Sequence, residues 1–195
     1  IRDSPNGVGK STFLGLVSGV FYPVEGEVNL FTNKVSYVSA YPMIIKGTLK
    51  ENILYGAEKN KASDQEIKNL ISKFELFENN NKNLDTKVSN KTLSSGQMQK
   101  LSFIRALLSN PELLLLDEST ANLDKKTKKL IYKILKELNI TILNSTHSSD
   151  DLEDFDFELS FSSVDGSTQI TESKNWWLNK NCLLYTSDAA DDGVG

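Results

Sequence analysis

The stretch "GVGKST" at residues 7–12 constrains the fold of this chain more than any other feature, because closely spaced glycines precede a lysine and a hydroxyl. Backbone N–H groups that turn inward around phosphate oxygens require such glycines, and Gly7 and Gly9 permit that close approach. Lys10 is placed to reach the phosphates and Ser11 to put a hydroxyl on Mg²⁺. A helix that follows would direct its positive end at the same phosphates. The stretch predicts a phosphate-binding loop.

Segments typical of strands and of helices alternate along the rest of the chain, which predicts an α/β fold with a parallel sheet covered on both faces. Residues 45–108 are expected to carry helices without strands between them, and therefore to form a helical subdomain inserted into the sheet. Ser63 with Glu66 forms a capping-box pattern at one helix start. The expected helices are one ending near Gly19, 63–74, one from Ser94 or Ser95 to before Pro111, and 125–138; the expected strands are 27–31, 34–39, and the buried 113–116 and 140–146.

Composition excludes several classes of protein. The 195 residues carry a formal net charge of −4, which is not the electrostatic footprint of a nucleic-acid-binding surface. No stretch approaches the ~18 consecutive apolar residues of a membrane helix. The single cysteine, Cys182, excludes a disulfide framework within the chain.

Both ends of the chain are unusual. A phosphate loop normally follows a buried strand, and Ile1 lies directly before the loop, so we interpret residues 1–181 as part of one domain cut at its N-terminus. Residues 182–195, beginning "CLLYTSDAAD", resemble the translation of a sequencing-library adapter and are excluded from the fold. A native unstructured tail is the alternative interpretation.

Two adjacent carboxylates follow the apolar run "LLLL". In "LLLLDE", Asp117 and Glu118 stand at the C-terminal end of an expected buried strand, which is where α/β sheets bind ligands. The first acid is suited to hold a metal ion, and the second to polarise an attacking water. A strand that simply ends in two solvated acids is the structural alternative.

The stretch "TLSSGQMQKLSFIRALLSNPELLLLDESTANLD" resembles the block of the ATP-binding cassette (ABC) ATPases that joins the LSGGQ signature to the Walker B strand. The signature stretch, Leu93–Gln97, reads "LSSGQ", with Ser95 in place of the first glycine. Residues 121–124 match the family's D-loop, and His147, the only histidine, stands at its switch position. "SSGQ" at a helix start is also a suitable anion site, although plain N-capping by these serines is the structural alternative.

The resemblance implies a P-loop NTPase (RecA-like) core that binds ATP and Mg²⁺ and pairs head to tail with a second cassette. It also implies a transmembrane domain as partner and a place at the cytoplasmic face of a membrane; no nucleic acid is expected as a partner, because of the net charge of −4. In-line attack of water on the γ-phosphate would use Glu118 and His147 as catalytic residues. The resemblance assigns the metal to Ser11 and Asp117, and the nucleotide to Ser4, Asn6, Gly7, Val8, Gly9, Lys10, Ser11, Thr12, Ser94, Ser95, Gly96, Gln97 and Asp124.

The stretch "YVSAYPMIIKGTLKENILYG" resembles the exporter class of this family. Two positions depart from the family pattern: Ser4 replaces the first loop glycine, and Ala40 replaces the Q-loop glutamine, which contacts the metal site and signals to the membrane domain. Two alternatives to an exporter ATPase therefore stay open. One is a soluble ribosome-associated ABC ATPase, disfavoured by the acidic composition, and the other is a regulatory cassette that binds ATP without turnover.

Overall fold

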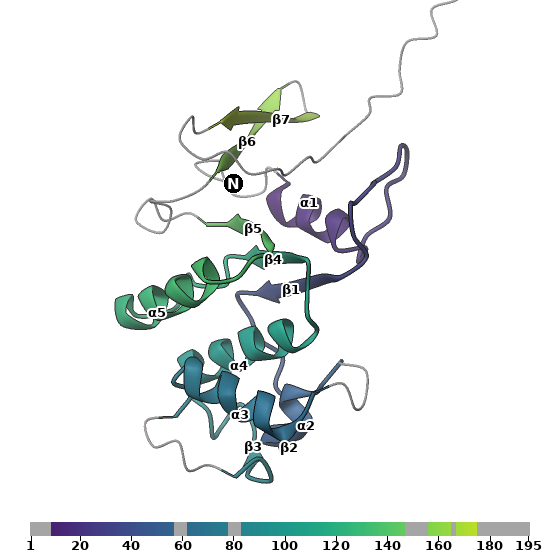
Figure 1. Cartoon of the computed structure of the whole chain (residues 1–195). Helices are drawn as coiled ribbons and strands as arrows, with labels where there is room; N and C mark the ends of the chain where they lie inside the picture. Colours follow the sequence, from purple (N-terminus) through teal and green to yellow (C-terminus); the bar gives the residue numbers. More distant parts are fainter. Residues whose placement is uncertain (1–8, 57–61, 78–82, 147–155, 165–166, 175–195) are drawn as a thin grey trace, which may run out of the picture.

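The fold consists of a parallel sheet with helices on both faces, a helical end and a separate β-hairpin (Figure 1). The structure is a computed structural model that describes residues 9–56, 62–77, 83–146, 156–164 and 167–174. Its helices are α1 (Lys10–Val17), α2 (Leu49–Ile53), α3 (Asp64–Lys73), α4 (Ser95–Leu108) and α5 (Lys125–Lys136). Its strands are β1 (Val35–Ser39), β2 (Gly47–Thr48), β3 (Lys87–Val88), β4 (Leu113–Asp117), β5 (Thr141–Ser145), β6 (Phe157–Val164) and β7 (Ser167–Lys174).

The parallel sheet has the strand order β1-β4-β5, which confirms the predicted α/β class. β4 is the middle strand, and all four of its leucines are buried, as the unbroken apolar run predicts. The in-register pairing places Ser39, Asp117 and Ser145 side by side at the carboxyl end of the sheet. This edge is where a doubly covered sheet binds its ligands.

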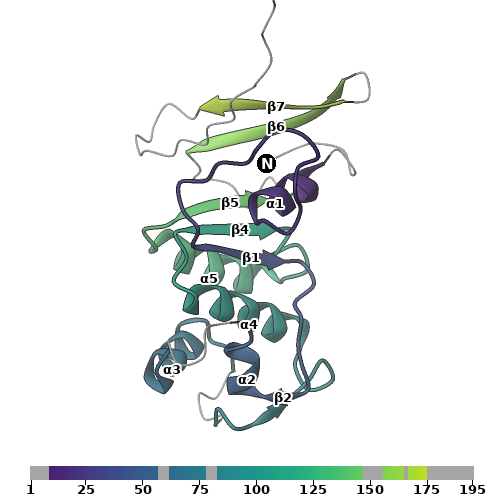
Figure 2. The same cartoon turned by 90° about the vertical axis from the view of Figure 1, so that its right-hand side faces the viewer.

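Helices cover both faces of this sheet (Figure 2). α1 packs on one face, where Leu14 and Val17 contact Leu113 and Leu115 of β4. On the other face, α4 and α5 share one core with Leu114 and the alternate positions of β1 and β4. Neighbouring residues of one strand point to opposite faces, so the four leucines of β4 supply both cores.

Capping signals read from the sequence are confirmed at two helices. The Ser63 side chain accepts a hydrogen bond from Glu66 N, and Glu66 returns one to Ser63 N at the start of α3. The same reciprocal pair joins Ser94 and Gln97 at the start of α4. α1 ends at Val17, close to the expected Gly19, which adopts a left-handed φ of 73°.

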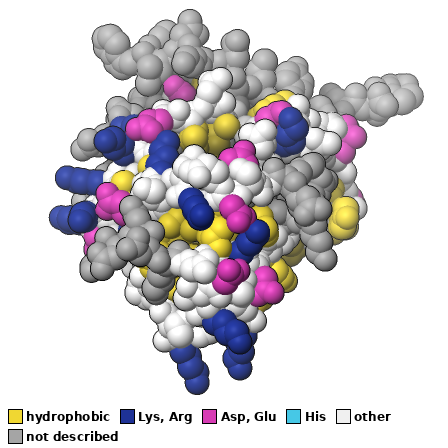
Figure 3. Space-filling model, turned by 60° about the horizontal axis from the view of Figure 1, so that its bottom comes forward, with side chains coloured by type: hydrophobic (Ala, Val, Ile, Leu, Met, Phe, Trp, Pro, Cys, Tyr) yellow, Lys and Arg dark blue, Asp and Glu magenta, His cyan; other side chains and the backbone are white. Residues whose placement is uncertain are grey.

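The helical end of the molecule consists of β2, α2, α3 and β3, within residues 47–88. The expectation that residues 45–108 lack strands is wrong. β2 and β3 form a short antiparallel pair there, and α2 was not predicted. Ile67 and Phe74 of this region lie in the same core as Leu114 and Leu116 of the sheet, so the helices do not bury their apolar faces separately. The domain boundaries themselves stay a prediction. Figure 3 views this end and shows hydrophobic side chains exposed among charged ones.

Two predicted strands differ from the structure. Residues 27–31 form no strand, and Val28 and Phe31 are 40% and 55% exposed, because no neighbouring strand in the described chain gives their alternating pattern a face to bury. β5 exists as predicted, but four of its five residues are only half-buried. It is an edge strand of the described three-stranded sheet, with a neighbouring strand on one side only, so its side chains are less covered than those of β4.

The β6–β7 hairpin was not predicted. Its long antiparallel pair lies on the same side of the sheet as α1 (Figure 1). Phe161 of β6 is 4% exposed and meets the Phe13 ring of α1 edge-on, with the ring centroids 5.4 Å apart. The hairpin therefore supports the helix that carries Lys10 and Ser11.

Candidate nucleotide and metal site

The described part of the phosphate loop is its junction with α1. Gly9 precedes the helix with a φ of 105°, a conformation that glycine adopts without strain. A Cβ at Gly9 would lie 3.5 Å from Thr168 Oγ1, so the hairpin approaches closely here. Lys10 is buried, with 7% of its surface exposed, whereas Ser11 and Thr12 are exposed. The other predicted loop residues, Ser4, Asn6, Gly7 and Val8, lie outside the described residues.

The fold brings the phosphate loop and the first strand-end carboxylate together. The Ser11 hydroxyl donates a hydrogen bond to Asp117 Oδ1 at 3.2 Å, although the two residues are 106 positions apart. Hydroxyl and carboxylate oxygens are ligands that Mg²⁺ prefers, and Mg²⁺ usually takes one or two carboxylates from a protein and its other ligands from waters and phosphates. Within the described ranges, no three His, Cys, Asp or Glu side chains form a metal cage. The hydroxyl of Ser11 and the carboxylate of Asp117 fit Mg²⁺ that a nucleotide carries, since phosphates and waters would supply its other ligands.

Asp117 also accepts a hydrogen bond that the sequence did not suggest. The Tyr37 hydroxyl, from β1, donates to Asp117 Oδ2 at 2.7 Å. Burial, followed by this hydrogen bond, raises the pKa of the Tyr37 phenol well above its ordinary value, so the phenol stays a protonated donor. The only signal in the sequence was a tyrosine near the end of the predicted strand 34–39. The sequence does not show that this strand pairs with "LLLLD", because strand order cannot be read from one sequence.

Glu118 follows directly, with an unusual backbone. Its φ is 50°, in the left-handed region that is rare for a side-chain-bearing residue. Glu118 N donates to Ser145 O at 2.9 Å, which ties the turn to the neighbouring strand. Strained backbone of this kind concentrates at functional sites. His147, the second predicted catalytic residue, lies outside the described residues.

The signature stretch stands at the N-terminus of α4. The side chains of Ser94 and Gln97 are engaged in the capping box, which confirms the structural alternative for Ser94. Ser94 and Ser95 are exposed, and a Cβ added at Gly96 would meet no atom within 4 Å. The exposed hydroxyls and the positive end of the helix dipole suit this end to an anion.

The structure does not bring the signature stretch and the phosphate loop of one chain together. α1 and α4 cover opposite faces of the sheet (Figure 2). The start of α1 and the start of α4, which carry the two groups of predicted anion-binding residues, therefore lie on different sides of the sheet.

Asp124, predicted to contact nucleotide through the D-loop, caps α5. Its Oδ1 accepts hydrogen bonds from Lys126 N at 2.9 Å and Thr127 N at 3.0 Å, and its Oδ2 accepts one from the Thr127 hydroxyl. These bonds, led by that from Thr127 N, lower the pKa of the carboxyl. The cap explains an aspartate at this position without any ligand.

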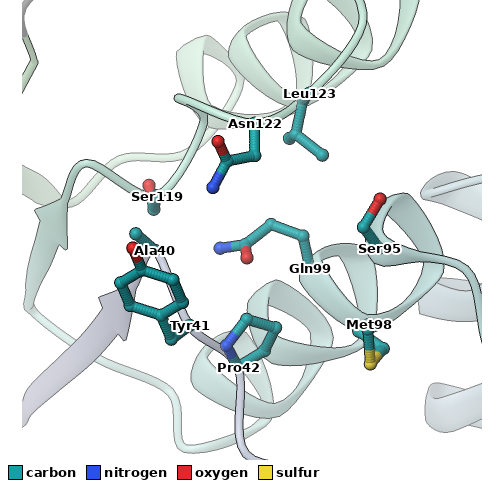
Figure 4. A pocket seen from close by; sticks show the side chains of 9 residues that line it. All are labelled: Ala40, Tyr41, Pro42, Ser95, Met98, Gln99, Ser119, Asn122 and Leu123. Atoms are coloured by element: carbon teal, nitrogen blue, oxygen red, sulfur yellow. The ribbon is translucent and has the colours of Figure 1, made fainter. Parts of the chain in front are cut away.

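A pocket of about 160 Å³ lies where the Q-loop position, α4 and the D-loop meet (Figure 4). Ala40 lines it where the family pattern has glutamine, and Gln99 Nε2 donates to Ser39 O at 2.9 Å across the same place. The sequence analysis did not identify Gln99 as a residue of this pocket. The available signal was a polar residue among the buried, mostly apolar residues of α4. The lining residues are Ala40, Tyr41, Pro42, Ser95, Met98, Gln99, Ser119, Asn122 and Leu123.

Comparison with known families gives a match to the family described as "ABC transporter" over residues 5–121. The chain belongs to the ABC transporter family. ATPase domains of this family hydrolyse ATP, and their core is a P-loop NTPase fold, as the sheet and its phosphate-loop helix show here. Of the helices in the described ranges, none is long and apolar enough to cross a bilayer.

Relatives of this ABC chain include importers and exporters. It is 38% identical over 148 residues to the nickel import system ATP-binding protein NikE of Staphylococcus aureus, covering 71% of this chain and 61% of that protein. It is 34% identical over 165 residues to the ATP-dependent permease MDL1 of Candida albicans, covering 73% of this chain and 24% of that one. A solved structure of a bacterial Atm1-family ABC exporter with ATP bound matches with a TM-score of 0.70 and 25% identity, covering 81% of this chain and 31% of that one.

Proposed function

We propose that this chain is the ATP-binding and ATP-hydrolysing unit of an ABC transporter, working at the cytoplasmic face of a membrane with a transmembrane domain. The observation that carries the proposal is the hydrogen bond between Ser11 and Asp117, because it joins the phosphate loop to the strand-end carboxylate at the carboxyl edge of the sheet. The relatives named above support a role in transport, because NikE is an ATP-binding protein of an import system and the Atm1-family structure is an exporter with ATP bound.

Each residue has a proposed role in that reaction. Lys10 would neutralise negative charge on the phosphates, and Ser11 with Asp117 would hold Mg²⁺, which supplies further charge stabilisation when it is bound. Glu118 would polarise the attacking water, and His147 would position it. Glu118 directly follows Asp117, the last residue of β4, at the carboxyl edge of the sheet.

The binding step is tested by titrating the full chain with a fluorescent ATP analogue. Lys10→Ala should nearly abolish Mg²⁺-dependent binding, because it removes a charge-assisted contact to phosphate. Lys129→Ala, which alters an exposed lysine on α5, is the matched control and should bind normally. Equal affinities for the two variants would contradict the proposed site.

The proposed partner cassette makes a separate prediction at Gly96. Gly96→Ala should leave the fold intact or slightly stabilise α4, because the added Cβ meets no atom within 4 Å and alanine favours a helix by about 1 kcal/mol. The same methyl would crowd a nucleotide held between two chains. We expect normal melting but weaker ATP-dependent dimerisation in analytical ultracentrifugation; normal dimerisation would argue against a signature-to-nucleotide contact.

Export is the direction we propose, from the "GTLKENI" stretch and from the similarity to the Atm1-family exporter. Import is the second candidate, because NikE also matches. The chain covers 24% of MDL1 but 61% of NikE, so the whole proteins differ greatly in length. Immunoblotting of source membranes would distinguish the candidates: a polypeptide several times larger than 21.7 kDa supports an exporter-like protein, and one less than twice that size supports a separate importer subunit.

A further inference from the structure

The hydroxyl of Tyr37 contacts the carboxylate of Asp117, one of the two proposed Mg²⁺ ligands. Tyr37 pairs with Leu115 in the β1–β4 register, on the face of the sheet that α1 covers. Its phenol reaches the strand end, where it donates to Asp117 Oδ2 at 2.7 Å. That distance lies within the range of a hydroxyl bonded to an ionised carboxylate, which is a charge-assisted and comparatively strong bond.

The two carboxylate oxygens of Asp117 have different partners. Oδ2 accepts from Tyr37 on β1, and Oδ1 accepts from the Ser11 hydroxyl on α1. Of the two oxygens, Oδ1 is therefore the one that contacts α1, through the Ser11 hydroxyl. A cation shared by Ser11 and Asp117 would use Oδ1, whereas at Oδ2 it would compete with the phenol for the negative charge of that oxygen.

This division of the carboxylate matters for the choice between divalent cations. Ca²⁺ takes six to eight oxygen ligands at ~2.3–2.6 Å and often binds a carboxylate through both oxygens. Mg²⁺ requires near-octahedral geometry at ~2.0–2.1 Å and accepts single carboxylate oxygens with waters. A carboxylate that offers a single oxygen to the cation is therefore better suited to Mg²⁺.

We propose that the Tyr37 hydroxyl is a positioning group that restricts Asp117 to one metal-facing oxygen and so makes the site select Mg²⁺ over Ca²⁺. The inference rests on the proposed function, since it assumes that a nucleotide-bound cation lies between Ser11 and Asp117. Packing alone does not account for the hydroxyl: phenylalanine would fill the same space on the β1 surface, where Tyr37 is 38% exposed.

The test compares the affinity of a fluorescent ATP analogue for the full chain in Mg²⁺ and in Ca²⁺. Tyr37→Phe removes one oxygen and leaves the ring in place. We expect the ratio of the Mg²⁺ affinity to the Ca²⁺ affinity to fall about tenfold to a hundredfold, the effect of one charge-assisted hydrogen bond. Mn²⁺ should also bind the variant more weakly with nucleotide, as measured by electron paramagnetic resonance. Tyr22→Phe, at an 88% exposed tyrosine, should leave the ratio unchanged.

Two further arms separate this inference from the proposed function. If Asp117→Asn leaves the metal dependence of nucleotide binding unchanged, the metal assignment itself is wrong. If Asp117→Asn abolishes that dependence while Tyr37→Phe keeps the wild-type ratio, only the role of Tyr37 is wrong. The unmodified chain provides a check that needs no variant: equal affinity in Mg²⁺ and Ca²⁺ would overturn the inference.

Discussion

At the scale of single residues, two neighbouring acids at the end of β4 have different environments. Asp117 ends the regular strand and is held by the hydroxyls of Ser11 and Tyr37. Glu118 leaves the strand with a φ of 50°, and its N–H is bonded to Ser145 O. The fold thus fixes the first carboxylate and turns the chain sharply at the second, which suits a metal ligand followed by a general base.

The first prediction concerns turnover at Glu118. Glu118→Gln should keep nucleotide affinity but lower the ATPase rate about 10²-fold to 10⁴-fold, because it removes the group proposed to polarise water. Phosphate release measured on the dimerised protein checks this. A turnover like that of the wild type would show that another group is the base, whereas absent turnover in the unmodified protein would favour the regulatory cassette.

The backbone at Glu118 provides a control for that experiment. Glycine adopts a positive φ more easily than alanine, so Glu118→Gly should be more stable than Glu118→Ala by about 1 kcal/mol. Both variants lose the same carboxylate, and urea denaturation measures the difference. If alanine were the more stable variant, strain at this position would be too small to matter.

At the scale of elements, α4 links the sheet to the helical end. Arg105 on this helix donates from Nε to Asn52 O at 2.9 Å and from Nη2 to Met43 O at 3.1 Å. Its guanidinium also lies 5.4 Å from the centre of the Tyr55 ring. One side chain thereby holds α2 and the segment after Ala40 to the helix that begins with the signature stretch.

Arg105→Lys should therefore destabilise the helical end. An ammonium group lacks the planar fork that serves two carbonyls at once, and a buried carbonyl would lose its donor. We expect the free energy of unfolding to fall by about 2 kcal/mol in urea denaturation. Lys100→Ala, on the same helix, removes one exposed bond to Glu75 O and should have little effect. Similar losses for both variants would contradict the linking role.

The capping box of α3 makes a prediction about pH. Hydrogen bonds from Ser63 N and the Ser63 hydroxyl lower the pKa of Glu66 below its ordinary value of 4.5. A lowered pKa means that this stabilisation is present above the unfolded pKa and is lost as the pH falls through the folded one. The Tm of the wild type should exceed that of Glu66→Gln at about pH 6, and the gap should close near about pH 3. Glu25→Gln, which caps no helix, should show no such change; a gap that widens in acid would contradict the sign.

At the scale of the whole molecule, two apolar cores lie on opposite faces of one sheet. The larger joins the helical end, α4 and α5 to the sheet, and the smaller joins α1 and the β6–β7 hairpin to it. The site lies where these parts meet at the carboxyl edge of the strands. Its geometry therefore depends on elements distant from one another in the chain.

Phe161 tests that dependence. Phe161→Ala should lower the free energy of unfolding by about 3 kcal/mol, because a buried ring contacting Phe13 is lost. Nucleotide affinity should fall as well, since α1 carries Lys10 and Ser11. Ile170→Ala, at the position paired with Phe161 but 45% exposed, is the control and should have a small effect on both. Wild-type nucleotide affinity in a destabilised Phe161→Ala would show that the hairpin supports stability alone.

The sequence by itself determined the elements whose signals are local. The capping box at Ser63, the apolar run of β4 and the motif residues from Lys10 to Asp124 are readable because helix caps, periodicity and motif spacing involve near neighbours along the chain. The α/β class and the family followed from these signals. Residues 27–31 show the limit, because their alternating pattern needs a partner that one sequence does not identify.

Tertiary structure alone decided which residues from distant segments of the chain contact one another. Strand order placed Tyr37 next to Asp117, and the packing of α1 on the sheet brought Ser11 within 3.2 Å of the same carboxylate. The β6–β7 hairpin and the edge position of β5 likewise depend on pairing between distant segments. Contacts of this kind arise from the burial of whole faces, which is a property of the packed molecule and has no local signature in the chain.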